Sequence, residues 1–159
     1  MAVEFFVPGQ PVGKGRPRAT VRAGRARLYT PARTADAEAR ADAVATLAMG
    51  DSPLMDGPLS LVLDVRCAIP TSWSKKKQAA ALAGEVRPTG RPDLDNIVKL
   101  YADAFNGVVW RDDSQVVRVV SEKRYSDRPG VLVTVMEGES NQHERDGAMV
   151  AWQYRMAGG

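Results

Sequence analysis

The sequence predicts one domain of the α/β (α+β) class, with a mixed β-sheet and two to three helices packed on it. The chain has 159 residues, which is the length of a single ordinary domain. Short apolar runs typical of strands alternate along it with longer runs typical of helices. The composition, 44% hydrophobic and 26% charged, excludes a disordered or fibrous protein.

The first expected elements are a strand, a loop and a helix. Residues 3–7 have the length and residue types of a short strand. Residues 13–18 contain too much glycine and proline for a regular element, so we expect a loop there. The alanine-rich run 32–49 predicts a helix that ends at Gly50, and the apolar run 58–69 predicts the next strand.

Two more helices and a hairpin are expected in the second half of the chain. Ser72 is placed to cap a short helix that extends over 72–82. Apolar residues recur at helical spacing over 94–105, which predicts an amphipathic helix. The valine-rich runs 116–125 and 131–136 are joined by turn residues, so they are expected to form a hairpin.

The folded domain is expected to span 1–136, because 137–159 is polar and turns acidic, as is typical of a flexible C-terminal tail. No apolar run reaches the roughly 18–20 residues that cross a bilayer. The first residues also lack the charged-then-apolar order of a signal peptide. We therefore expect a cytoplasmic protein without a membrane segment.

The chain has one cysteine and one histidine, which limits the available chemistry. Cys67 lies in an apolar run and is expected to be buried, and a zinc site with several thiolates is excluded. His143 alone argues against a Ser-His-Asp triad. Residues 9–15 lack the glycine spacing and the final hydroxyl of a P-loop, so no nucleotide cofactor is expected. Catalysis would have to use carboxylates and lysines.

Positive charge is concentrated near the start of the chain. The net charge is +3, and residues 1–40 contain eight basic side chains against three acidic ones. Such a segment suits a polyanion, and the glycines of the loop 13–18 permit close approach to DNA phosphates. A solvated, flexible basic loop is the plainer interpretation of the same residues.

Carboxylates are expected to gather around the helix that begins at Leu94. Asp93 and Asp95 lie at its start, and Asp112–Asp113 precede the next strand, so three carboxylates converge if that strand pairs near the helix start. Oxygen ligands suit Mg²⁺ or Mn²⁺, which activate water against phosphodiesters. Lys99, one turn from Asp95, would orient the water or neutralise the developing charge.

The plainer interpretation of these acids is structural. Aspartate is favoured at a helix N-terminus by capping and by the helix dipole, and the pair 112–113 is also an ordinary polar turn. The protein would then be a non-catalytic module that binds branched DNA. A nuclease that prefers flaps or forks is a further alternative within the enzymes.

Four separated blocks agree in spacing and chemistry with one known pattern. The blocks are Arg91-Pro92-Asp93-Leu94-Asp95-Asn96-Ile97-Val98-Lys99, then Asp103-Ala104-Phe105-Asn106-Gly107-Val108-Val109-Trp110-Arg111-Asp112-Asp113-Ser114-Gln115-Val116-Val117, then Gly13-Lys14-Gly15-Arg16-Pro17-Arg18 with Tyr29-Thr30-Pro31, and Glu122-Lys123-Arg124-Tyr125 with Arg128-Pro129-Gly130. Together they resemble the RusA family of Holliday junction resolvases, in particular its phage-type members, over residues 3–136.

The resemblance implies a RusA-like fold and a Mg²⁺-dependent, homodimeric endonuclease that nicks two opposed strands of a four-way DNA junction in a bacterial or phage-infected cell. It implies metal-binding acids at Asp93, Asp95 and Asp113 and a catalytic lysine at Lys99. Asp112 is an alternative ligand, because the loop before the acidic pair is about one residue shorter than in the bacterial pattern. The expected contacts to branched duplex DNA are Lys14, Arg16, Arg18 and Arg91.

Overall fold

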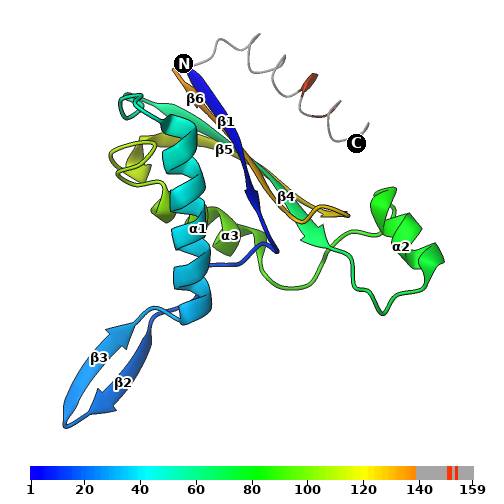
Figure 1. Cartoon of the computed structure of the whole chain (residues 1–159), viewed down its shortest axis with the longest axis horizontal. Coiled ribbons are helices and arrows are strands. Elements are labelled where there is room, and N and C mark those ends of the chain that lie inside the picture. Colours follow the sequence, from blue (N-terminus) through cyan, green and yellow to red (C-terminus); the bar gives the residue numbers. More distant parts are fainter. Residues whose placement is uncertain (139–149, 152, 154–159) are drawn as a thin grey trace.

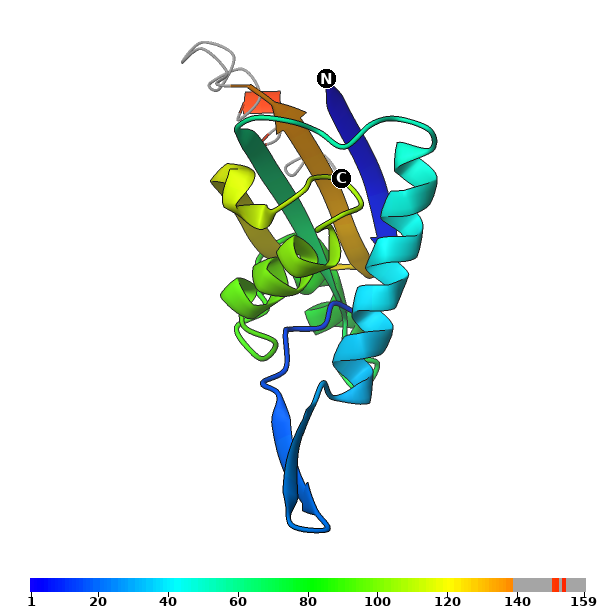
Figure 2. The ribbon, with the colours of Figure 1, turned by 90° about the vertical axis from the view of Figure 1, so that its left-hand side faces the viewer.

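A four-stranded mixed sheet with helices on one face forms the body of the computed structural model, which describes residues 1–138, 150, 151 and 153 (Figure 2). The strand order is β1-β6-β4-β5, with bounds Ala2–Pro8 for β1, Gly130–Glu137 for β6, Leu59–Ala68 for β4 and Val116–Ser126 for β5. β6 is antiparallel to both of its neighbours, and β4 and β5 are parallel. The predicted α/β class and mixed sheet are confirmed.

β4 is one of the two inner strands of the sheet, and its position corrects the predicted hairpin. β4 pairs with β6 on one side and with β5 on the other. The turn after Ser126 therefore carries the chain across β4 and not back along β5. The hairpin prediction was wrong because residue alternation is local, whereas the choice of partner depends on burial. β4 buries most of its residues, and its backbone N–H and C=O groups form hydrogen bonds to a strand on each side.

Two helices lie on the same face of the sheet (Figure 2), as the sequence predicts. α1 (Ala32–Met49) packs against β1 and against α3 (Leu94–Ala104), and α3 also contacts β5. Phe105 follows α3 directly and makes edge-to-face ring contacts with Phe5 and Trp110, at centroid distances of 5.4 and 5.7 Å. These rings fasten the C-terminal end of α3 to the core.

The third helix, α2 (Lys75–Leu82), begins later than predicted. Its N-cap is Ser74, whose side chain accepts a hydrogen bond from the Lys77 backbone N–H at 3.2 Å. The predicted cap, Ser72, lies in the preceding turn, where the Trp73 N–H binds the Pro70 carbonyl. Both serines precede the lysine run, but only Ser74 stands three residues before a free helical N–H.

A two-stranded ribbon projects from the body and was not predicted (Figure 1). It consists of β2 (Arg18–Arg22) and β3 (Arg25–Tyr29), paired antiparallel. Arg18, predicted to lie in a loop, is the first residue of β2. Every residue of both strands is exposed, although polar and apolar residues alternate along each of them.

The last strand extends one residue past the expected end of the folded domain. Glu137 closes β6, and its carboxylate lies 3.6 Å from the amino group of Met1. His143 and most of the expected tail lie outside the described residues. Among the helices of the described part, none is long and apolar enough to cross a membrane.

Candidate functional site

The acidic residues at the start of α3 are exposed and are not used as helix caps. Asp93 occupies the N-cap position in an extended conformation, yet its side chain makes no capping hydrogen bond. Asp95 lies in the first turn, where the partial positive charge of the helix end favours a carboxylate. Capping therefore does not explain why Asp93 is acidic.

The segment before α3 is held in place by a lysine from the sheet. The Lys123 ammonium group, on β5, donates to the carbonyl oxygens of Gly90 and Pro92 at 2.9 and 3.0 Å. These contacts fix the backbone that leads into Asp93. They place Lys123, the eighth residue of β5, beside the start of α3.

The basic loop packs directly on this acidic segment. The Lys14 backbone N–H donates to the Asn96 carbonyl at 2.9 Å. A Cβ atom at Gly13 would stand 3.0 Å from the Pro92 side chain and 3.1 Å from that of Asn96, so glycine permits the close approach. Two segments about 80 residues apart in the sequence, one basic and one acidic, thus form a single surface.

The side chain of Lys14 turns inward to two carboxylates. It binds Glu38 on α1 and lies 3.1 Å from Asp103 on α3, which in turn lies 3.7 Å from the Lys99 ammonium group. Partial burial lowers the pKa of Lys14, but the hydrogen bonds to Glu38 and Asp103 outweigh it and raise the pKa above its ordinary value. The loop, α1 and α3 are therefore joined by one ion-pair network.

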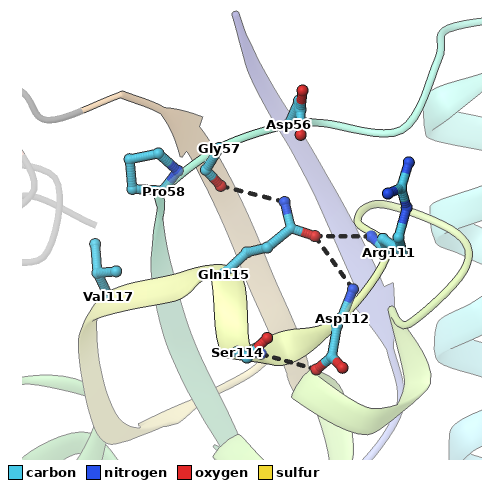
Figure 3. A pocket seen from close by; sticks show the side chains of 8 residues that line it. All are labelled: Asp56, Gly57, Pro58, Arg111, Asp112, Ser114, Gln115 and Val117. Carbon is cyan, nitrogen blue, oxygen red and sulfur yellow. Dashed lines mark hydrogen bonds between the residues drawn. The ribbon is translucent and has the colours of Figure 1, made fainter.

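Asp112 is engaged in a local turn (Figure 3). It caps a 3₁₀ turn, Asp113–Gln115, by accepting from the Ser114 N–H at 3.0 Å, while the Gln115 side chain accepts from the Asp112 N–H at 3.1 Å. The Gln115 amide also donates to the carbonyls of Met55 and Gly57, both at 3.2 Å. Asp112, Ser114, Gln115 and Gly57 border an open groove of about 480 Å³.

The pKa values of the two neighbouring aspartates are shifted in opposite directions. The hydrogen bond from Ser114 lowers the pKa of Asp112, whereas the contact with Asp112, followed by partial burial, raises the pKa of Asp113. The negative charge of Asp103 also raises the pKa of Asp113, and the positive charge of Lys99 lowers it.

The structure does not assemble the predicted metal ligands. In the described part of the chain, no group of three or more His, Cys, Asp or Glu side chains is close enough to hold a metal ion. The donor set itself, three aspartates, has the oxygen chemistry that Mg²⁺ prefers. The expected convergence depended on the next strand pairing near the helix start. β5 reaches that end of α3 through Lys123, ten residues after Asp113.

The predicted arginine contacts lie at the surface. Arg16, Arg18 and Arg91 are exposed, and within the described residues none of them forms an ion pair. Sequence reasoning missed Glu38 and Gln115 and gave Asp103 no role. Asp103 alone carried a signal, since it stands four residues after Lys99 on the same helix face.

Comparison with known proteins gives two findings. The family model described as Endodeoxyribonuclease RusA matches residues 8–136. The chain is also 38% identical, over 137 residues, to the uncharacterized protein YqaN of Bacillus subtilis (strain 168). That alignment covers 85% of this chain and 96% of the Bacillus protein.

Proposed function

Because the chain belongs to the RusA endodeoxyribonuclease family, we propose that it is a structure-selective nuclease that resolves four-way DNA junctions by paired nicks. The observation that carries this proposal is the packing of the basic loop on the acidic start of α3, through Lys14 and Asn96. A DNA strand bound by the arginines that follow the loop would pass beside Asp93 and Asp95. The substrate and the hydrolytic groups would thus meet on one surface.

We assign the metal site of this nuclease to Asp93, Asp95 and Asp113, with Mg²⁺ as the ion and Mn²⁺ as a substitute. A bound ion of this kind lowers the pKa of water and neutralises charge on the attacked phosphate. Asp112 is the weaker candidate, because its carboxylate already caps the 3₁₀ turn. Since the three assigned carboxylates stand apart in the described structure, metal binding requires their side chains to move together.

Lys99 is the proposed catalytic lysine. Its side chain is exposed, and Asp103 lies one turn further along α3, within 3.7 Å of the ammonium group. A lysine held in this way can orient the attacking water or neutralise charge that develops on the phosphate. Asp103 is then a positioning residue, because it acts through Lys99.

The proposed DNA contacts are Arg16, Arg18 and Arg91, joined by Lys14. The arginines are free to bind phosphates, whereas the charge of Lys14 is already shared with Glu38 and Asp103. We therefore assign most of the binding free energy to the arginines. Lys14 serves mainly to hold the loop against α3.

A non-catalytic protein that binds branched DNA is the second candidate. The observation in its favour is that the described acids do not form a ready three-ligand cluster. In this second candidate function the protein binds branched DNA through the same basic surface, but it does not hydrolyse the DNA.

An assay with labelled four-way junctions tests the proposal. The protein is incubated with the junction with and without Mg²⁺, beside a flap, a fork and a linear duplex of matched sequence. Symmetric nicks in the junction that need Mg²⁺ are expected. Junction binding without cleavage in Mg²⁺ or Mn²⁺ would favour the second candidate, and faster cutting of flaps or forks would change the substrate.

Asp95→Asn is the matched variant for this assay. It should cut at least about a hundredfold more slowly, because it removes an assigned ligand, while the arginines still bind the junction. Asp51→Asn, an exposed aspartate outside the site, controls for the lost charge. Mg²⁺-dependent cleavage by Asp95→Asn at the normal rate would refute the ligand assignment.

A further inference from the structure

The projecting ribbon separates its side chains by chemistry. The register pairs Arg22 with Arg25 and Thr20 with Arg27. Because directly paired residues share a face and alternate residues return to it, all the charges lie on one side. The charged residues of this face, which we call the arginine face, are Arg18, Arg22, Arg25 and Arg27. The opposite face carries Ala19, Val21, Ala26 and Leu28.

The arginine face has no counter-charge in the described structure. The sequence contains no acidic residue between Glu4 and Asp36. Three arginines of the body are paired with acids, Arg66 and Arg124 with Asp64 and Arg87 with Glu122, but no ion pair involves the four ribbon arginines among the described residues. The direct pairing of two arginines across the ribbon instead places like charges opposite each other, which destabilises the hairpin.

The ribbon gains little from the rest of the molecule to offset this repulsion. Its strands are fully exposed, and neither packs extensively on another helix or strand of the described chain. A two-stranded ribbon by itself is only marginally stable in water. A polyanion bound along the arginine face would remove the repulsion and stabilise the ribbon at the same time.

The ribbon is continuous with the candidate site. β2 begins at Arg18, four residues after Lys14, whose backbone binds the start of α3. From there both strands extend away from the body (Figure 2). Five residues of strand span about 16 Å, and DNA rises 3.4 Å per base pair along each strand. The arginine face therefore matches the length of roughly five base pairs.

We propose that the arginine face binds the phosphate backbone of a duplex arm next to the cleavage site, as a second DNA-binding element of the protein. The inference rests on the proposed function, since it takes the arms of branched DNA as its ligand. A two-stranded ribbon fits the major groove of B-DNA, and the guanidinium fork matches a phosphate. The contact adds affinity without reading sequence.

The double variant Arg22→Gln/Arg25→Gln tests the inference through the salt dependence of junction binding. Log K falls as log salt rises, and each lost phosphate contact makes this slope shallower by about 0.9. The slope of the variant should therefore be shallower by roughly two. Between 50 and 200 mM salt, the variant should lose roughly tenfold less affinity than the wild-type protein. The variant removes the cross-strand repulsion, so unfolding of the ribbon would not explain the loss.

Three controls separate the outcomes. Lys75→Gln/Lys76→Gln removes the same charge on α2 and should leave the slope unchanged. Arg22→Lys/Arg25→Lys keeps the charge and should keep most of the slope. Val21→Thr/Leu28→Thr alters only the opposite face and should leave binding unchanged. A salt slope that stays at the wild-type value in Arg22→Gln/Arg25→Gln would overturn the inference. An equal change of slope in the α2 variant would overturn it too.

Failure of the inference differs from failure of the proposed function. If the wild-type protein cuts junctions but the arginine variant keeps the normal slope, the ribbon does not contact DNA. If no cleavage occurs but the slope falls as expected, the nuclease proposal fails and the ribbon inference stands.

Discussion

Asp112 and Asp113 adjoin each other in the sequence, yet they have different surroundings. Asp112 accepts the Ser114 N–H and has a lowered pKa, whereas Asp113 has a raised pKa and lies within the influence of Lys99. Asp112→Ala should therefore lower the melting temperature, because the 3₁₀ turn loses its cap. Asp113→Ala should keep the melting temperature and lose at least about a hundredfold in cleavage.

Calorimetry and junction cleavage on the two purified variants check this contrast. The reverse pattern, with cleavage lost in Asp112→Ala and kept in Asp113→Ala, would assign the metal ligand to Asp112. The sequence identified the acidic pair but did not distinguish its members. What distinguishes them is the turn that Asp112 caps. The side chain of Gln115 holds this turn by binding the Asp112 N–H and the carbonyls of Met55 and Gly57, which lie about 60 residues earlier in the sequence.

Cys67 offers a prediction on thiol chemistry. It is buried in β4, and this burial raises the pKa of its thiol, an effect that Lys123 only partly opposes. The folded protein should therefore react with a disulfide reagent far more slowly at pH 8 than the protein in denaturant. A rate equal to that of the unfolded chain would contradict the burial of Cys67.

The same raised pKa has a consequence for stability. The unfolded thiol ionises above about pH 8.5, whereas the folded thiol stays neutral to higher pH. Above that pH the unfolded state binds fewer protons, so the contribution of Cys67 to stability decreases as the pH rises. Burial of Cys67 was predicted from its apolar strand and is confirmed.

At the scale of elements, the ribbon turn contains a correctable flaw. Ala23 adopts a φ of 53° and Gly24 a φ of 73°, the left-handed region that alanine disfavours. Ala23→Asn should stabilise the ribbon by about 1 kcal/mol, because Asn-Gly suits a two-residue hairpin turn. Hydrogen exchange of the β2 and β3 amides should slow several-fold, whereas Ala26→Asn, inside a strand, should not slow it.

Elements differed in how well the sequence predicted them. α1 and α3 were predicted to within a residue, because alanine content, helical spacing and breakers at both ends all agree. The ribbon was missed because Ala-Gly is a weak turn signal, and the alternation of polar with apolar residues in its two short strands was not recognised. The pairing of β5 was mistaken because it depends on β4, which lies far away in the sequence.

At the scale of the whole molecule, the number of cleavage sites determines the expected assembly. One chain offers one set of candidate carboxylates, but resolving a four-way junction requires two symmetric nicks. A twofold dimer supplies the second site in the orientation that the junction demands. We therefore expect a particle of about twice the 17.2 kDa chain mass in light scattering.

Cleavage of a cruciform plasmid checks the same expectation. A dimer should release linear product without a long-lived nicked intermediate, because both strands are cut within one binding event. A monomeric mass on junction DNA together with random single nicks would exclude paired resolution. It would favour a nuclease for flaps or forks.

The pairing of β1 with β6 sets the order in which the domain can close. β1 pairs with a strand that ends at Glu137, so the sheet cannot be completed until that strand has been synthesised. At roughly 5–20 residues per second, the arginine-rich segment is made several seconds or longer before β6. A chain with the proposed function would therefore expose its basic segment before the completed sheet holds its candidate carboxylates in place.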